Sequence, residues 1–343
     1  MSFLPTPPTF DSFHDAYLAV LDSVTAEPDH RTSSRGNDSA EITNVSFRLT
    51  NPRNRLPFLR RRPVNVVYNL AETLWYAAGR DDLDMIGYYA PGMATYSANG
   101  RSLTGTAYGI KIFAPDARGE TQWDRVVELL RADPDTKRAV LSIYRAEELA
   151  VAANPDVSCT LAAQFLLREG RLHLTCYMRG NDAYMGMVSD VFAFTFLQEV
   201  AARELGVELG HYTHHVGSMH VNDRDAKAVR RLLNEPRQPG YVRPAFPSPV
   251  MPASTGTATM CVVLEHEEAL RTGQADYTVD QVGALDLPEY WRQVVLLLEI
   301  YRQIKHTDDP VGADHLAALD GGYRWLVMNR WKNRMPTDVG AVA

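Results

Sequence analysis

The chain has 343 residues, 45% hydrophobic and 22% charged, with 20 prolines and 22 glycines, which excludes collagen-like, disordered and disulfide-framework classes. Its 42 acidic and 35 basic residues give a net charge of −7, so no overall electrostatic attraction to nucleic acid is expected. Three cysteines, no apolar run of about 18 residues and no signal-like N-terminus together predict a cytoplasmic protein with reduced thiols.

The first third of the chain combines a helix, a polar stretch and a strand. Residues 11–25 carry apolar side chains at helical spacing, with Asp11 as the candidate N-cap. The polar residues 27–41 that follow predict a mobile loop. Residues 41–50 alternate between apolar and polar and predict a strand.

A second helix is predicted over residues 64–78, ending at Gly79. Glu72 lies inside this otherwise apolar helix. Because a buried carboxylate without a partner is costly, Glu72 either faces solvent or has a functional role.

The central part of the chain carries the clearest local pattern. A short helix is predicted over 122–131 and a buried strand over 138–145. Residues 158–179 alternate strictly around Glu169-Gly170, which predicts a β-hairpin.

The remaining elements complete a mixed pattern of strands and helices. A long apolar helix follows Asp190 and ends at Gly206, residues 209–222 predict a strand, and residues 289–306 predict a helix. Because strands and helices do not alternate strictly, the sequence predicts an α+β fold around one large sheet.

Common catalytic motifs are absent: there is no GxxxxGK[ST], GxGxxG, HExxH or CxxC. Four histidines, His211, His214, His215 and His220, cluster in one predicted strand. Only alternate residues of a strand share a face, and no cysteine or carboxylate completes a ligand set, so no metal site is predicted.

Cys159 is a candidate nucleophile at the start of the hairpin. A cysteine on a strand is usually an inert core residue. Here the preceding Asn-Pro-Asp turn favours a place at the sheet rim, and Arg179 at the end of the paired strand is expected close by. A guanidinium near a thiol lowers its pKa and raises the nucleophilic thiolate fraction.

Polar residues gather between the hairpin and the long helix. The run Arg179–Asp182 is followed by Gly186 and Asp190. These residues form either a solvated turn with Asp190 as N-cap, or the floor of a polar pocket with a helix N-terminus directed into it.

The segment 158–222 resembles the central block of thymidylate synthases and their pyrimidine hydroxymethylase relatives, because nucleophile, arginine, pocket carboxylates and a GSMH element occur in order. Weaker similarity extends over about residues 30–225 through ETLWYAAG, GTAYG and DPDTKRAVLSIY, whereas residues after about 240 match poorly. The resemblance implies a single thymidylate synthase-like domain over residues 1–343. It also implies one large mixed sheet packed by helices, and a sheet-to-sheet homodimer.

The resemblance implies a catalytic set. Cys159 would add to C6 of a pyrimidine, which makes C5 able to attack the methylene of 5,10-methylenetetrahydrofolate. Glu72 would organise proton transfer through water, and Tyr108 would assist at C5. Hydride delivery from the folate would give a methyl product, and water addition a hydroxymethyl product.

Phosphate contacts are also implied. Arg179 would bind the nucleotide phosphate, and Arg31 or Arg35 would clamp the same phosphate. Lys137 and Arg138 would reach the phosphate of the other subunit, although the family usually has two arginines at that place.

Contacts to the sugar and the folate follow from the same resemblance. His220 would contact the sugar, and Asp182 would hold the pterin ring, with Met185 and Gly186 beside it. The C-terminal tail, residues 336–343, does not clearly match the synthase tail that closes over folate.

Three departures from synthases point to a different product. Synthases carry Asn at Asp190, and a carboxylate suits the N4 amine of cytosine with a proton shared at N3. Asn222 replaces a usual tyrosine and leaves room and a polar partner for a 2′-hydroxyl. Residues 93–96 replace a tryptophan-bearing stretch, and Asp156 and Ser189 fall at apolar positions, which implies a wetter folate site that favours water.

These departures predict 5-hydroxymethylation of cytidine monophosphate with methylenetetrahydrofolate and water, without a metal. The chain is in this respect similar to CMP 5-hydroxymethylases of mildiomycin-type nucleoside antibiotic pathways. A dCMP hydroxymethylase, a thymidylate synthase acting on dUMP and a non-catalytic nucleotide-binding homologue stay open as alternatives.

Overall fold

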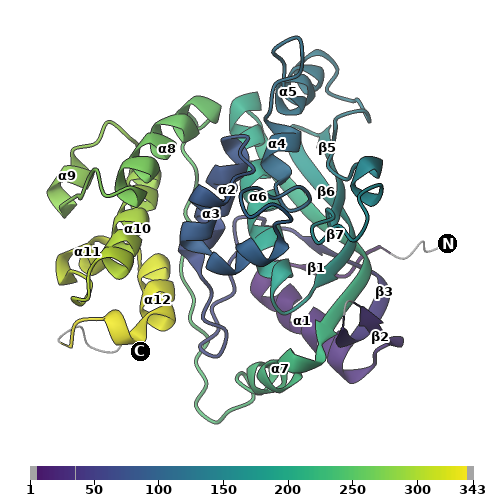
Figure 1. Cartoon of the computed structure of the whole chain (residues 1–343), viewed down its shortest axis with the longest axis horizontal. Helices are drawn as coiled ribbons and strands as arrows, with labels where there is room; N and C mark the ends of the chain where they lie inside the picture. Colours follow the sequence, from purple (N-terminus) through teal and green to yellow (C-terminus); the bar gives the residue numbers. More distant parts are fainter. Residues whose placement is uncertain (1–5, 35, 338–343) are drawn as a thin grey trace.

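The computed structural model describes residues 6–34 and 36–337. These residues form a mixed seven-stranded sheet in the order β1-β3-β7-β6-β5-β4, with β2 paired to β3 (Figure 1). The strands are β1 (Thr9–Phe10), β2 (His30–Ser34), β3 (Asn37–Leu49), β4 (Val140–Ser142), β5 (Thr160–Arg168), β6 (Arg171–Asp182) and β7 (Glu208–Asn222). The α+β prediction is confirmed.

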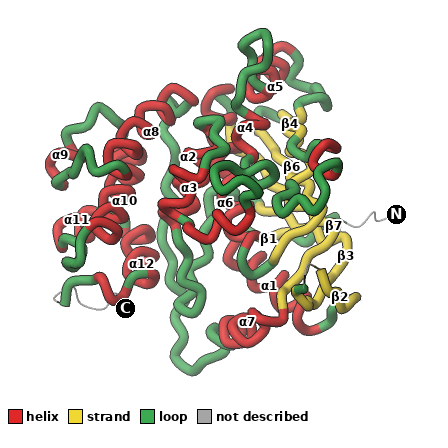
Figure 2. The backbone as a smooth tube through the Cα atoms, in the orientation of Figure 1, coloured by secondary structure: helices red, strands yellow, loops and turns green. Residues whose placement is uncertain are grey.

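Helices cover one face of the sheet and extend into a C-terminal helical group, residues 257–334 (Figure 2). The α-helices are α1 (Phe13–Ala26), α2 (Val66–Ala77), α3 (Leu83–Tyr89), α4 (Tyr108–Ile112), α5 (Gln122–Ala132), α6 (Gly186–Leu205), α7 (Ala226–Leu233), α8 (Thr257–Arg271), α9 (Val279–Gly283), α10 (Glu289–His306), α11 (Ala313–Ala318) and α12 (Gly321–Arg330). Short 3₁₀ helices are η1 (Pro91–Tyr96), η2 (Ala146–Leu149), η3 (Asp223–Asp225) and η4 (Lys332–Arg334). Among the described residues no helix is both long and apolar enough to span a membrane.

The long helix α6 lies against the sheet and forms the centre of the core. Phe192, Phe194 and Phe196 of this helix are almost fully buried, as its unbroken apolar sequence requires. Helix α2 packs on α6, and the C-terminal helical group packs on α2 and α3 (Figure 1). The fold is therefore layered, with the sheet, then α6, then α2, and then the C-terminal helices.

The topology brings three strand ends together. Strands β6 and β7 are parallel and joined by α6, so their carboxyl ends lie at the same edge of the sheet, where Asp182 pairs with His220. Strand β5 is antiparallel to β6 and begins at this edge, where Thr160 pairs with Met178. Ligands of sheet proteins bind preferentially at such an edge.

Several local predictions are confirmed. The hairpin turns at Glu169 and Gly170, both with positive φ (51° and 70°), as a two-residue turn of this hand requires. Helix α2 ends just before Gly79, whose φ of 62° is the left-handed conformation that glycine permits. The bounds of α10 agree with the predicted 289–306.

Three local predictions are wrong. The polar stretch 27–41 is not a loop, because within it β2 pairs antiparallel with the first residues of β3. Arg35 lies outside the described residues. Ser12, not Asp11, caps α1, since the Ser12 hydroxyl accepts the backbone N–H of Asp15. The long helix does not begin after Asp190, because α6 begins at Gly186 and includes Asp190; of the two interpretations left open for Asp190, the N-cap is thereby excluded.

Buried polar contacts link α6 and α3 to segments far away in the sequence. Glu199 of α6 is fully buried and accepts hydrogen bonds from the Arg53 and Arg55 side chains and from the backbone N–H of Met251. Tyr89 at the end of α3 donates to Glu267 of α8 at 2.8 Å.

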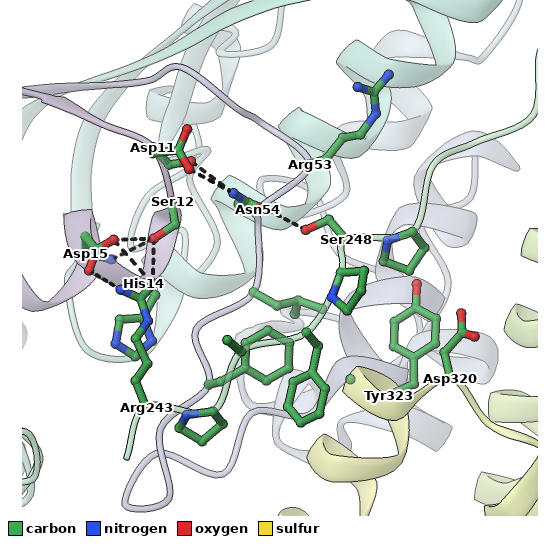
Figure 3. Close-up of a pocket in the computed structure, with 18 residues that line it drawn as sticks. Asp11, Ser12, His14, Asp15, Arg53, Asn54, Arg243, Ser248, Asp320 and Tyr323 are labelled. Carbon is green, nitrogen blue, oxygen red and sulfur yellow. Dashed lines mark hydrogen bonds and ion pairs between the residues drawn. The ribbon is translucent and has the colours of Figure 1, made fainter. Parts of the chain in front are cut away.

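A cavity of about 390 Å³ lies between the start of α1, the loop after β3 and the segment 243–249 (Figure 3). Phe58, Phe246 and Tyr323 supply aromatic walls, and Arg243 is ion-paired with Asp15 at its rim. None of the residues that line this cavity belongs to the Cys159 region described next.

Candidate active site

Cys159 lies at the start of β5, at the sheet edge where β6 and β7 end, and is partly buried. The Arg179 side chain donates from Nε to the Ser158 carbonyl and from Nη2 to the Val157 carbonyl, both at 2.8 Å. The expected proximity of Arg179 to Cys159 is confirmed. The Arg179 backbone N–H also donates to the Cys159 carbonyl at 2.8 Å.

Glu72 projects from α2 into the seam between α2 and α6 and is almost fully buried. Tyr68, one turn earlier, donates its hydroxyl to Glu72 Oε1 at 2.6 Å. Burial raises the pKa of Glu72 to about 8; the Tyr68 hydrogen bond opposes this rise, and the nearby Asp190 charge adds to it. Glu72 therefore does not face solvent, and its pKa suits a group that exchanges protons near neutral pH.

Tyr108 begins the short helix α4 and is buried. Its hydroxyl accepts the backbone N–H of Thr160 at 3.3 Å, which places it beside Cys159. Burial raises the pKa of Tyr108 well above its usual value, and the neighbouring Asp190 and Cys159 act in the same direction. Tyr108 thus stays neutral and is able to donate or relay a proton.

Asp190 is the last acceptor of a directional chain of hydrogen bonds. Asn181 Nδ2 donates to Asp190 Oδ2 at 2.8 Å, so the amide oxygen of Asn181 faces His214 Nε2 at 3.0 Å. His214 must therefore carry its proton on Nε2, and Tyr212 donates to His214 Nδ1 at 2.8 Å.

The protonation states along this chain follow from burial. Burial lowers the pKa of His214 to about 3, so its ring is neutral, and it raises the pKa of Asp190 to about 7 against the lowering effect of Asn181. Asp190 is thus held in one orientation and is close to half-protonated at neutral pH.

Asp182 and Asn222 form a second polar pair. Asn222 Nδ2 donates to Asp182 Oδ2 at 2.7 Å, and the backbone N–H groups of Tyr184 and Met185 donate to Asp182 Oδ1 at 2.9 and 3.0 Å. These three bonds leave about one lone-pair position of the carboxylate for a further donor. His220 lies beside this pair and pairs with Asp182 across the strands.

Gly186 and Met185 lie at the start of α6. A Cβ atom on Gly186 would come within 3.2 Å of Asn181 Nδ2 and 3.5 Å of Asp190 Oδ2, so glycine permits the close approach of α6 to this chain. The Met185 side chain is exposed, and its sulfur lies 3.9 Å from Arg62 Nη2.

The candidate phosphate ligands are more widely spread. Arg31 is exposed and ion-paired with Asp223 at 2.8 Å, beside a hollow of about 650 Å³. Lys137 and Arg138 are exposed at the other end of β5, where Gln164 donates to the Lys137 carbonyl. The fold therefore brings together Cys159, Arg179, Glu72, Tyr108 and Asp190, but leaves Lys137 and Arg138 away from them.

The prediction that Asp156 makes the folate site wetter is wrong. Asp156 is buried, and its carboxylate accepts the backbone N–H groups of Thr104, Gly105 and Thr106 and the Thr106 hydroxyl. Asp156 therefore shapes the loop before Tyr108 and does not make a folate site wetter. Ser189, by contrast, donates to Asn69 Oδ1 at 2.9 Å within the seam between α2 and α6.

Comparison with known proteins decides the family. Residues 15–245 match the family described as thymidylate synthase. The chain belongs to the thymidylate synthase family. The poor resemblance after about residue 240 agrees with the end of this match, so the C-terminal helical group lies outside the matched region.

Three proteins similar to this chain carry the name deoxyuridylate hydroxymethyltransferase. The Bacillus phage SP01 protein is 34% identical over 238 residues, covering 63% of this chain and 59% of the relative. The Pseudomonas phage M6 protein is 26% identical over 314 residues, 84% of each chain, and the Delftia phage PhiW-14 protein is 32% identical over 198 residues, 54% of each. The chain thus spans 59% of the length of the first relative.

The donors and acceptors at the site fit a folate co-substrate. Asp182 keeps about one lone-pair position after its three hydrogen bonds, and this is an acceptor that a pterin ring would need. Within residues 6–34 and 36–337 no group of three His, Cys, Asp or Glu side chains is placed to hold a metal ion.

Sequence reasoning missed three functional features. Asn181 was seen only as part of a polar run, His214 only as a possible metal ligand, and Asn69 not at all. A polar residue at a core-facing position of a helix, three residues before Glu72, is the signal by which the sequence could have indicated Asn69.

Proposed function

We propose that the chain is a pyrimidine nucleoside monophosphate 5-hydroxymethyltransferase that prefers cytidine monophosphate and uses methylenetetrahydrofolate and water. The observation that carries the proposal is the grouping of Cys159 and Arg179 with three buried groups, Glu72, Tyr108 and Asp190. The names of the three relatives support the hydroxymethyl product.

The residues divide the chemistry as follows. The Cys159 thiolate forms a bond to C6 of the base, which makes C5 nucleophilic toward the one-carbon unit that the folate supplies. Glu72, with a pKa of about 8, takes the C5 proton, and Tyr108 beside Cys159 relays protons at the same face. Water takes the one-carbon unit, so no reductant is consumed.

Asp190 supports cytosine as the base. Its Oδ2 accepts from Asn181, so Oδ1 is available to accept from the N4 amine of cytosine. A carboxyl group with a pKa of about 7 is also able to share a proton with N3. The O4 atom of uracil would instead face an acceptor, a mismatch worth about 1–3 kcal/mol.

Asn222 supports a ribonucleotide. Its Nδ2 is engaged with Asp182, which leaves Oδ1 as an acceptor for a sugar 2′-hydroxyl. Because deoxyribose lacks that donor, CMP is preferred over dCMP. We expect Asn222→Tyr to lower the use of CMP relative to dCMP.

Deoxyuridylate is the second candidate substrate, because all three reported relatives are named for it. An ionised Asp190 is able to accept from N3–H of uracil, which makes this reading chemically consistent. An antibiotic-pathway role, as for mildiomycin-type enzymes, stays a prediction from the sequence.

A sheet-to-sheet homodimer belongs to the same proposal. Alternate residues of β6 and β7 are buried against α6, while His173, Thr175, Tyr177 and His215 on the other face stay partly exposed. Lys137 and Arg138 lie away from Cys159 of their own chain. A second copy packed on this face would let them reach its nucleotide phosphate.

A competition assay tests the proposal. CMP, dCMP and dUMP at equal concentration are incubated with the enzyme and methylenetetrahydrofolate, and products are identified by mass spectrometry. A hydroxymethyl group mainly on CMP is the expected result. A hydroxymethyl group found mainly on dCMP would refute the inference that Asn222 selects a ribonucleotide. A hydroxymethyl group found mainly on dUMP would refute both this inference and the inference that Asp190 selects cytosine.

Two other outcomes refute the hydroxymethylase itself. A methyl product on dUMP, with dihydrofolate formation seen as an absorbance increase, would identify a thymidylate synthase. No product from the wild-type chain, with nucleotide binding equal to that of Cys159→Ser, would identify a non-catalytic nucleotide-binding homologue.

A further inference from the structure

Asn69 carries a buried polar group that nothing described so far explains. It lies on α2 and is 2% exposed, and its amide nitrogen Nδ2 has no hydrogen-bond partner among the described residues. Leaving a buried N–H group without an acceptor is costly, so native proteins rarely tolerate it outside functional sites.

The surroundings of Asn69 place it in the catalytic seam. Asn69 precedes Glu72 by three residues, which puts both side chains on the same side of α2. Ser189 of α6 donates its hydroxyl to Asn69 Oδ1 at 2.9 Å, and Ser189 directly precedes Asp190. The seam between α2 and α6 thus holds a neutral polar pair, Asn69 and Ser189, beside the carboxyl groups of Glu72 and Asp190.

We propose that the Asn69–Ser189 pair holds the water molecule that attacks the one-carbon unit on the pyrimidine. This inference rests on the proposed hydroxymethyltransferase function. The Asn69 amide N–H donates to the water oxygen. The Ser189 hydroxyl donates to Asn69 Oδ1, and this bond fixes which side of the amide group carries the N–H. Glu72, on the same side of α2, accepts the proton that the water releases.

The step balances without a further reagent. The C5 proton that Glu72 takes passes to the amine of the departing tetrahydrofolate, which leaves the methylene carbon double-bonded to C5 and Glu72 ionised again. The water oxygen then forms a bond to this methylene carbon, and one water proton passes to the Glu72 carboxylate. The electron pair of the methylene double bond moves toward C4. It then re-forms the C5–C6 double bond and expels the Cys159 thiolate. Nothing is oxidised or reduced, so the geometry of the water decides whether this path is followed.

The test compares Asn69→Leu and Ser189→Ala with Thr73→Val. Leucine has the same number and branching of side-chain heavy atoms as asparagine but no amide, and Ser189→Ala removes one oxygen atom. Thr73 is a fully buried polar residue on the same helix whose hydroxyl bonds the Asn69 carbonyl, so Thr73→Val is a matched control. CMP, methylenetetrahydrofolate and 2-mercaptoethanol are supplied, because the thiol competes with water for the methylene carbon and gives a thioether of distinct mass.

A second readout needs no folate. Thiolate addition by Cys159 followed by proton exchange at C5 incorporates deuterium from heavy water into CMP. We expect Asn69→Leu to form hydroxymethyl product about tenfold more slowly. In this variant the thioether should make up a larger share of the total product than in wild type. The rate of C5 exchange and the Kd for CMP should stay within about twofold of wild type, because only a hydrogen bond to water is lost. Ser189→Ala should act in the same direction, and Thr73→Val should leave the product ratio unchanged.

The outcomes separate this inference from the proposed function. An unchanged ratio of thioether to hydroxymethyl product in both seam variants would overturn it while leaving the hydroxymethyltransferase intact. A parallel loss of C5 exchange would also overturn it, because the pair would then have only a structural role. A wild-type enzyme that yields only methyl product would overturn both proposals.

Discussion

The pH dependence of nucleotide binding reports which base Asp190 recognises. Burial raises the pKa of Asp190 to about 7, so the free enzyme is half-protonated there. A pair between a carboxyl group and cytosine holds one shared proton, whereas the N3–H of uracil needs the ionised carboxylate. The affinities for the two bases therefore change in opposite directions as the pH rises through 7.

The size of the effect follows from this pKa. Between pH 6.5 and 8.5 the protonated fraction of a group with a pKa near 7 falls from about 0.76 to about 0.03. The Kd for CMP should then rise about 25-fold, and the Kd for UMP should fall about fourfold. The phosphate group titrates in the same way in CMP and UMP, so its effect cancels in the ratio of the two Kd values. The pH dependence of this ratio therefore reports only the contact between Asp190 and the base.

Calorimetric titration of the Glu72→Gln variant is the cleanest measurement, because it removes the second carboxyl group that titrates near neutral pH. Asp190→Asn should flatten both curves. Asn181→Leu removes the donor to Asp190 and should move the midpoint about 1–2 pH units higher, the equivalent of a lost bond to a charged group. Kd values for CMP and UMP that change in the same direction would refute the reasoning.

Three further predictions concern stability and assembly. The unfolded chain releases the Glu72 proton near pH 4.5 and the folded chain near pH 8, so this group lowers stability as the pH rises between them. Glu72→Gln should therefore raise the free energy of unfolding at pH 8 relative to pH 5 by about 3–4 kcal/mol, measured by urea titration. Burial raises the pKa of Glu199, but the ion pairs with Arg55 and Arg53 outweigh burial and lower this pKa below its usual value. Glu199→Gln should therefore reduce the free energy of unfolding by about 3–5 kcal/mol near pH 7 and by less below pH 4. An unchanged melting temperature would contradict the buried ion pair. Cys159→Ser mixed with a Lys137→Ala/Arg138→Ala double variant should recover activity if the second subunit completes each site, and no recovery after subunit exchange would contradict the shared site.

The sequence by itself determined several local elements and singled out Cys159 as the candidate nucleophile. The hairpin that places Cys159 near Arg179 follows from strict alternation around Glu169-Gly170, because strand period and turn chemistry are properties of adjacent residues. The end of α2 at Gly79 and the bounds of α10 follow in the same way. Glu72 could be singled out because a carboxylate in an apolar helix needs a reason.

Only the tertiary structure decided the partners and protonation states of these groups. Asp190 meets Asn181 and His214 because β6, α6 and β7 converge at one sheet edge. The polar stretch around Arg31 becomes a strand because β3 offers it backbone hydrogen bonds, which no pattern within the stretch records. A side chain's burial and neighbours come from segments far apart in the chain, so the raised pKa values of Glu72 and Asp190 and the unpaired amide of Asn69 could not be found from local sequence.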